Sequence, residues 1–194
     1  MIILASTSPT RRALLDNAGL PYSAVSPQVD ERGLVAQHPH WSPEETAIRL
    51  AEAKALDVSI RFPDAIVIGA DQVLSLGSKA YSKPANLEEC RQHLFELRGK
   101  THALISTVVC ARGGEAVWSY TSQALLTMRE FSQAFLEDYL ETVGADCMTS
   151  VGGYKIEGCG LQLFERIEGD HFTILGLPLL PLLSYLRTAG EILT

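Results

Sequence analysis

Two arginines near the N-terminus stand where a protein can bind a polyphosphate. The apolar run Ile2–Leu4 predicts a buried strand, and Ser8 followed by Pro9 predicts the N-cap and the first residue of a helix. The N-terminus of such a helix carries backbone N–H groups without partners, and the helix dipole favours anions there. Arg11 and Arg12 fall in the first turn, and a guanidinium binds phosphate oxygens through its planar fork. The spacing indicates a phosphate site, and an ordinary capped helix with two solvated arginines is the alternative.

An aspartate after the second apolar strand is the best candidate for proton transfer or metal binding. Residues 65–69, A-I-V-I-G, predict a buried strand that leads into Ala70-Asp71-Gln72. In open α/β sheets, ligands bind beyond the carboxyl ends of the strands. We therefore expect Asp71 to be a general base or a metal ligand. An aspartate that caps a turn explains the position equally well.

Two lysines can join a phosphate site. Lys54 is expected on a helix that begins at a capping box, residues 42–45, and ends near Arg61. Lys83 precedes Pro84, which biases the lysine to an extended backbone and lets its side chain reach out of the loop. A solvated lysine is the alternative at both positions.

Acidic side chains outside the strands are more ambiguous. Asp30 and Glu31 are expected in a polar loop, residues 26–33, where solvated acids are commoner than metal ligands. Glu157 lies in the glycine-rich segment 152–160, G-G-Y-K-I-E-G-C-G, which lacks the Gly-Lys-Ser/Thr of a P-loop. Glu157 either recognises a ligand through its carboxylate or is only an acid in a turn.

Composition limits the class of protein. The 194 residues are 46% hydrophobic and 20% charged, and the net charge is −7. These values favour a globular protein and argue against a nucleic-acid partner, which usually needs a basic face. The four cysteines lack zinc-site spacing and are expected as free buried thiols. With no secretory signal and no apolar segment long enough for a bilayer, we expect a cytoplasmic protein without a membrane partner.

The elements that must position these residues alternate between strands and helices. Further helices are expected after the caps Asn86 and Ser132 and after Pro178, and further strands at 22–25, 73–76, 101–112, 115–128 and 172–175. Glycine pairs or Gly-Ser at 77–78 and 113–114 predict hairpins. The chain has no G-x-S-x-G and no H-E-x-x-H motif, so nucleophilic hydrolases and zinc proteases have no support.

Taken in order along the chain, several motifs resemble those of the Maf nucleotide pyrophosphatases. They extend from Met1 to about Leu186 and comprise S-T-S-P-T-R-R-A-L-L, Val29-Asp30-Glu31, the helix with Ala51 and Lys54, G-A-D-Q, Lys83-Pro84, G-G-Y-K-I-E-G-C-G and the closing G-L-P-L. The resemblance implies an α/β fold in one domain, residues 1–194. It implies a long mixed β-sheet flanked by helices, with two lobes around a central cleft (Maf/ITPase-like), and a homodimer.

The resemblance also implies an activity. A nucleoside triphosphate is cleaved between the α and β phosphates, which gives the monophosphate and pyrophosphate, with a divalent cation such as Mg²⁺ or Mn²⁺. Asp71 is the implied proton acceptor and, with Glu31, belongs to the metal site. The implied phosphate-binding residues are Ser6, Ser8, Arg11, Arg12, Lys54 and Lys83.

Three positions separate the branches of this family, and here they hold Thr10, Gln72 and Glu157. Gln72 and Glu157 resemble the 7-methyl-GTP branch, whereas Thr10 matches neither that branch nor the dTTP/UTP branch. A carboxylate accepts hydrogen bonds from the guanine N1–H and exocyclic amine, which favours a guanine substrate. A dTTP/UTP pyrophosphatase, a non-catalytic nucleotide-binding regulator of cell division and a general phosphatase are the alternatives.

Overall fold

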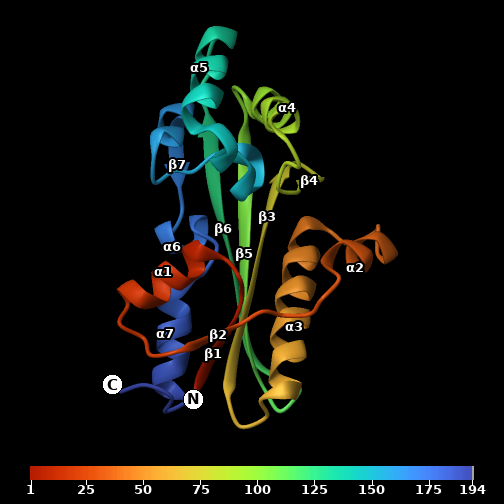
Figure 1. Cartoon of the computed structure of the whole chain (residues 1–194), viewed down its shortest axis with the longest axis vertical. Coiled ribbons are helices and arrows are strands. Elements are labelled where there is room, and N and C mark those ends of the chain that lie inside the picture. The colour runs from red at the N-terminus through yellow and green to blue at the C-terminus, as the bar shows by residue number, and fades with distance from the viewer. Residues whose placement is uncertain (194) are drawn as a thin grey trace. The chain divides into compact units, whose positions relative to one another are not determined.

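Within residues 1–193, which the computed structural model describes, seven strands form one mixed sheet flanked by helices (Figure 1). The strand order is β2-β1-β3-β5-β6-β7, and β4 pairs with β3. β1 is parallel to both β2 and β3, whereas the β3–β4 and β6–β7 pairs are antiparallel. The elements are β1 (Ile2–Ala5), α1 (Pro9–Asn17), β2 (Ser23–Val25), α2 (Glu31–Gln37), α3 (Pro43–Arg61), β3 (Ile66–Leu76), β4 (Lys79–Tyr81), α4 (Leu87–Leu97), β5 (Thr101–Arg112), β6 (Glu115–Met128), α5 (Gln133–Val143), β7 (Phe164–Glu168), α6 (His171–Ile174) and α7 (Leu179–Thr188), with 3₁₀ turns η1 (Gly144–Thr149), η2 (Val151–Gly153) and η3 (Cys159–Leu163) between α5 and β7. The expected mixed α/β sheet is confirmed.

The chain divides into two units. Unit 1 comprises residues 1–72, 105–123 and the chain from Asp170 onward, and unit 2 comprises residues 73–104 and 124–169. Strands β3, β5 and β6 each contribute residues to both units. The central cleft implied by the resemblance stays a prediction.

In unit 1, helices cover both faces of the sheet (Figure 1). On one face, Ile66 and Ile68 of β3 pack in a core cluster with Leu15 of α1 and Leu182 of α7. On the other face, Val67 of β3 packs with Val58 of α3. Successive residues of a strand point to opposite faces, so the parity of a β3 residue decides which helix it meets.

Gly69 allows α3 to lie very close to β3. A Cβ atom at Gly69 would lie 2.4 Å from the carbonyl oxygen of Ala51 and 2.7 Å from the Cβ of Ala55. Ala51 and Ala55 are both fully buried, so α3 presents small side chains where the contact is tightest. The helix therefore reaches the strand because neither side carries a bulky group.

Unit 2 comprises α4, α5, the 3₁₀ turns, β4 and β7, together with residues 73–76 of β3, 101–104 of β5 and 124–128 of β6. Its glycine-rich segment is held by packing: a Cβ at Gly152 would lie 2.5 Å from Leu74, and one at Gly153 would lie 2.5 Å from the Cys90 sulfur. His102 is buried beside the Tyr154 hydroxyl, 2.6 Å from its Nε2, and burial lowers the pKa of His102 to about 4. The close backbone approach at Gly152 and Gly153 is thus made to other parts of unit 2.

Most sequence-based boundaries are confirmed. The Ser42 capping box opens α3, which ends at Arg61, and the β5–β6 hairpin turns at Gly113 and Gly114, both with positive φ. The four cysteines are free thiols, and three of them are buried. Among residues 1–193, none of the helices has the length and apolarity to cross a membrane.

Three local predictions are wrong. Asp71 does not follow a strand that ends at Gly69, because β3 continues to Leu76. The expected loop 26–33 contains the start of α2, since the Asp30 side chain caps the helix by accepting a hydrogen bond from the backbone N–H of Gly33. Residues 172–175 lie in and directly after the short helix α6, not in a strand, and the last strand is β7.

We predict that Gly69→Ala lowers the free energy of unfolding by about 1–3 kcal/mol, because the added methyl group overpacks the contact with α3. Urea denaturation followed by circular dichroism measures the change. Gly158→Ala is the control, since a Cβ there meets nothing within 4 Å. Equal stability of the two variants would contradict the proposed role of the close contact.

Candidate active site

The turn between β1 and α1 is ordered by its serines. The backbone N–H of Ser8 donates to the Ser6 hydroxyl at 3.1 Å, and the Ser8 hydroxyl accepts from the backbone N–H of Arg11 at 3.4 Å. Arg12 donates from Nη2 to the Ser6 carbonyl at 3.4 Å. The predicted N-cap at Ser8 is confirmed, and the turn is a preformed helix N-terminus with basic side chains beside it.

Arg11 is half-buried and is oriented by one backbone carbonyl. Its Nε donates to the Gly176 oxygen at 2.8 Å, and within residues 1–193 its two terminal nitrogens make no hydrogen bond. Burial lowers the pKa of Arg11, while the negative charges of Asp71 and Glu31 raise it. The fork of the guanidinium is therefore held in place with both ends available for an anion.

Lys54 joins two carboxylates. Its Nζ lies 2.7 Å from Asp71 Oδ1 and 2.8 Å from Glu31 Oε2. Lys54 and Asp71 are both buried, whereas Glu31 is exposed. Burial raises the pKa of Asp71 above its ordinary value, and Lys54 and Arg11 oppose that rise. A carboxylate in this state is a better proton acceptor than one in water.

The pleat of β3 and the face of α3 together explain why these charges meet. Asp71 continues the odd-numbered series of Val67 and Gly69, which faces α3. Lys54 directly precedes Ala55 on α3. Because α3 lies so close to β3 at Gly69, the Lys54 ammonium group reaches Asp71, which is the next β3 residue on that face.

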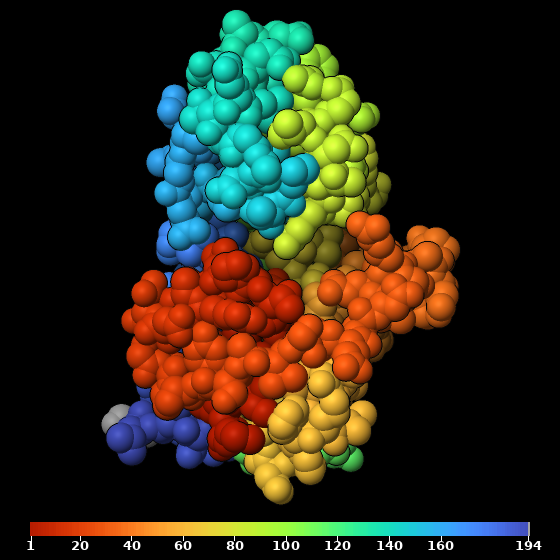
Figure 2. Space-filling view, in the orientation of Figure 1, coloured from red at the N-terminus to blue at the C-terminus, as the bar shows by residue number. Residues whose placement is uncertain are grey.

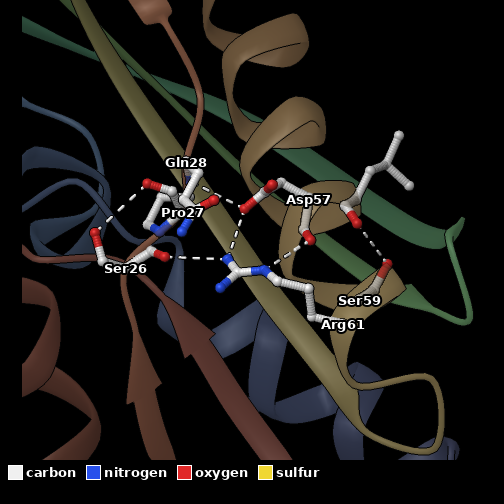
Figure 3. Close-up of polar contacts among 7 residues, drawn as sticks. Ser26, Pro27, Gln28, Asp57, Ser59 and Arg61 are labelled. Carbon is white, nitrogen blue, oxygen red and sulfur yellow. Dashed lines mark hydrogen bonds and ion pairs between the residues drawn. The ribbon is translucent and has the colours of Figure 1, made fainter.

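Glu31 is the first residue of α2, and the segment before this helix is bound by two side chains of α3, which we call the clamp. The clamp is formed by Asp57 and Arg61: Asp57 Oδ2 accepts from the backbone N–H of Gln28 at 2.9 Å, and Arg61 Nη2 donates to the Ser26 carbonyl at 3.1 Å (Figure 3). The two clamp side chains are also paired with each other at 2.7 Å. Because the clamp fixes the segment that leads to α2, it sets where Glu31 meets Lys54.

α2 itself contributes little packing. None of its residues, 31–37, is buried, and the helix stands out from the rest of unit 1 at the right of the space-filling view (orange; Figure 2). Sequence reasoning missed both this helix and its clamp. The local signal for the helix is Asp30, a residue type that often caps a helix N-terminus, and here its side chain accepts from the backbone N–H of Gly33. An aspartate is also common in loops, so this signal alone does not require a helix.

Gln72 faces away from Asp71. The two N–H groups of its side-chain amide are shared among three acceptors at 2.9–3.0 Å, the Ser106 hydroxyl and the carbonyls of Thr173 and Ile174. These contacts lie on the face of the sheet that α1 and α7 cover, where Val108 and Cys110 of β5 also pack. Sequence reasoning missed Ser106 and Thr173, because nothing in their local pattern marks a partner so distant in the chain.

The remaining predicted site residues lie in α1 and in unit 2. Thr10 is half-buried in the first turn of α1. Lys83 and Glu157 belong to unit 2, and both are exposed. Their roles in phosphate binding and base selection stay predictions.

The donor set suits a divalent cation that is completed by substrate. Within the described chain, no three His, Cys, Asp or Glu side chains are grouped as a preformed metal site. Mg²⁺, however, is usually bound by one or two carboxylates together with substrate phosphates and water. Asp71 and Glu31, which share Lys54 at 2.7 and 2.8 Å, provide such a pair.

Comparison with known proteins identifies the family of this chain. The family described as "Maf-like protein" matches residues 1–189. The chain belongs to the Maf-like protein family. The resemblance inferred from the sequence motifs is thereby confirmed.

Curated relatives are similar over nearly their whole length. The 7-methyl-GTP pyrophosphatase of Rhizobium meliloti (strain 1021) is 52% identical over 194 residues, which cover 99% of this chain and 98% of the relative. The protein of the same name from Mesorhizobium japonicum is 54% identical, with 98% and 97% covered. The nucleoside triphosphate pyrophosphatase of Rhodospirillum rubrum is 47% identical, with 100% and 96% covered.

Among solved structures, a nucleoside-triphosphatase / dITP/XTP pyrophosphatase from Mycobacterium abscessus matches with a TM-score of 0.40 and 15% identity. The match covers 67% of this chain and 74% of that chain. A likeness this weak adds nothing to the family assignment.

We predict that Lys54→Met lowers the free energy of unfolding by about 3–5 kcal/mol at pH 7.5, because it leaves the buried carboxylate of Asp71 without its partner. The double variant Lys54→Met/Asp71→Leu should recover most of the loss. The deficit of the single variant should shrink as pH falls, since loss of Lys54 raises the pKa of Asp71 further and the folded protein then takes up a proton before the unfolded chain does.

Urea denaturation at several pH values measures these effects. Arg166→Met is the matched control, because the ion pair of Arg166 with Glu168 is exposed and its loss should cost little. A Lys54→Met variant no less stable than this control would contradict a tightly coupled buried pair.

Proposed function

We propose that this protein hydrolyses a nucleoside triphosphate between the α and β phosphates, releasing the nucleoside monophosphate and pyrophosphate, with 7-methyl-GTP as the preferred substrate. The observation that carries the proposal is the buried Lys54–Asp71 pair, with Glu31 on the same ammonium group and Arg11 close enough to influence Asp71 electrostatically. The names of the relatives support the reaction and the substrate.

The phosphates are bound by the turn between β1 and α1. The hydroxyls of Ser6 and Ser8 and the helix N-terminus offer hydrogen bonds, and Arg11 offers its two terminal nitrogens. Arg12 adds positive charge at the same turn. Binding the triphosphate here holds the reacting phosphorus in place, which removes much of the entropic cost of the attack.

Asp71 accepts the proton of the attacking water. As the water oxygen bonds to the α-phosphorus, the bond from that phosphorus to the bridging oxygen breaks, and pyrophosphate leaves with the bonding electrons. The raised pKa of Asp71 suits a base at this step, and Lys54 holds the carboxylate in a fixed orientation. Lys54 also offsets negative charge beside the reacting phosphate.

A divalent cation fits the two carboxylates. Asp71 and Glu31 would hold it, with phosphate oxygens completing its shell. When bound, it supplies charge neutralisation for the phosphates and polarises the phosphoryl oxygen.

The base is selected by residues outside this cluster. Glu157 offers a carboxylate to the guanine N1–H and amine, and Thr10 and Gln72 are the other positions that separate the branches. We further propose that the chain acts as one domain, residues 1–194, because the family match runs through both units. The homodimer and the cytoplasmic location stay predictions.

We predict that Asp71→Asn lowers kcat for pyrophosphate release by about 10²–10⁴-fold, because the amide cannot accept the proton of water. Incubation with 7-methyl-GTP and Mg²⁺, followed by separate assays for pyrophosphate and inorganic phosphate, measures it. Asp64→Asn, at an exposed aspartate just before β3, is the control.

The products decide between the alternatives. Wild-type release of inorganic phosphate alone would indicate a general phosphatase, and nucleotide binding without either product would indicate a regulator. Pyrophosphate release by Asp71→Asn at the wild-type rate would remove Asp71 from the proposal.

We predict that kcat/KM of the wild type is highest for 7-methyl-GTP in a panel with GTP, UTP, dTTP and CTP. Glu157→Gln should narrow the ratio of 7-methyl-GTP to UTP by about tenfold, because a carboxylate that accepts from guanine is replaced by an amide. Combining it with Gln72→Thr should move the preference further toward pyrimidines. Glu165→Gln, at an exposed position of β7, is the control, and an unchanged ranking in both Glu157 variants would rule out this account of base choice.

A further inference from the structure

A buried network links strand β5 to the short helix α6. The Ser106 hydroxyl donates to the Thr173 carbonyl at 2.7 Å and accepts from the Gln72 amide at 3.0 Å. The same amide donates to the carbonyls of Thr173 and Ile174, at 3.0 and 2.9 Å. Ser106 and Thr173 are almost completely buried, at 0% and 1% exposure, so the network is shielded from water.

The orientation of the Gln72 amide is fixed by its surroundings. A flipped amide would place its oxygen against two carbonyl oxygens, which cannot donate a hydrogen bond. α6 has only four residues, and its last carbonyls need donors from outside the helix. Backbone N–H groups of Gly176 and Leu177 supply donors for the Thr173 and Phe172 carbonyls, and the side chains of Gln72 and Ser106 supply the donors for Ile174 and a further contact to Thr173.

The capped end of α6 leads directly to the carbonyl that orients Arg11. The Thr173 carbonyl also accepts from the backbone N–H of Gly176 at 3.1 Å, which closes the turn after the helix. Gly176 adopts φ +88°, and its carbonyl oxygen accepts from Arg11 Nε at 2.8 Å. A Cβ at Gly176 would lie 3.5 Å from Gln72 and 3.6 Å from Arg11, so the three residues are in one packed group.

We infer that Ser106 is a positioning residue for the phosphate-binding guanidinium of Arg11. It holds the Gln72 amide and the Thr173 carbonyl, these fix the turn at Gly176, and the Gly176 carbonyl fixes Arg11 Nε. Ser106 itself touches no substrate. The inference rests on the proposed function for the identity of the anion, but the orientation of Arg11 can be measured without any ligand.

The route from Ser106 to Arg11 predicts which kinetic constant changes. A guanidinium that loses its fixed orientation binds phosphate less well, whereas Asp71 lies on the opposite face of β3 and keeps its partner Lys54. Ser106→Ala should therefore raise KM for the nucleotide and Kd for inorganic pyrophosphate by about tenfold, with kcat changed less than about threefold.

The matched control is Ser59→Ala. Ser59 is another serine with 0% exposure, and its hydroxyl also donates to a carbonyl, that of Leu56, and accepts from a backbone N–H, that of Gly114. Both variants remove the same buried group and should lower the midpoint of thermal unfolding by similar amounts. Calorimetric titration with pyrophosphate and steady-state kinetics on both proteins separate positioning from stability alone. Equal Kd and KM values in the two variants would overturn the inference.

Two further measurements connect the effect to Arg11. In the wild type the Arg11 Nε–H should exchange slowly with solvent, and this protection, followed by ¹⁵N NMR and assigned with Arg11→Lys, should be lost in Ser106→Ala and kept in Ser59→Ala. In an Arg11→Lys background, Ser106→Ala should weaken pyrophosphate binding no further. Full protection in Ser106→Ala, or additive losses in the double variant, would show that Ser106 does not act through Arg11.

These readouts fail separately from the proposed function. A wild type that releases no pyrophosphate, while Ser106→Ala still loses the Nε–H protection, would reject the reaction and keep the positioning role. Normal pyrophosphate release by the wild type, together with full Nε–H protection in Ser106→Ala, would keep the reaction and reject the positioning role.

Discussion

The geometry of the candidate site depends on how closely α3 approaches β3. At Gly69 the two backbones are separated by less space than a single methyl group needs, and on the helix side Ala51 and Ala55 carry only methyl groups. This contact sets the distance between the axis of α3 and the sheet. Lys54, next to Ala55, can then reach the residue two positions further along the strand, which is Asp71. A bulkier strand residue would move the whole helix, and the charge pair would separate with it.

The pleat of β3 distributes two tasks between adjacent residues. Asp71 points toward α3 and the lysine, whereas Gln72 points toward the other face and caps α6. A single strand segment thus places the carboxylate and also fixes the carbonyl that orients Arg11. The charges compensate one another: two cations, Lys54 and Arg11, are set against Asp71 and Glu31, which makes the burial of Asp71 tolerable. These contacts hold the four charged side chains of the cluster in place.

Local patterns in the sequence predict much of this arrangement. The Ser8 and Ser42 caps, the apolar run Ile2–Leu4 and the Gly113–Gly114 turn are short-range signals, and each places an element correctly. The end of β3 could not be predicted in the same way, because Asp71 interrupts the apolar run and only Lys54, from another element, makes a buried aspartate acceptable in a strand. α6 was mistaken for a strand because its apolar residues suit either structure, and the deciding contacts come from Asp170 and from Gln72 far away in the chain. Ser106 gave no signal at all, since its role exists only through tertiary contacts.

The lack of buried residues in α2 has a consequence for how the site can work. Its apolar residues Leu34 and Val35 are only partly buried, so opening this helix exposes less apolar surface than any movement of β3 or α3, whose facing residues are fully buried. The outer carboxylate, Glu31, is therefore held mainly by polar contacts, whereas the inner one, Asp71, is buried in the sheet. Of the three charged partners, Glu31 is thus the one that local unfolding separates first, while the buried Lys54 and Asp71 stay paired.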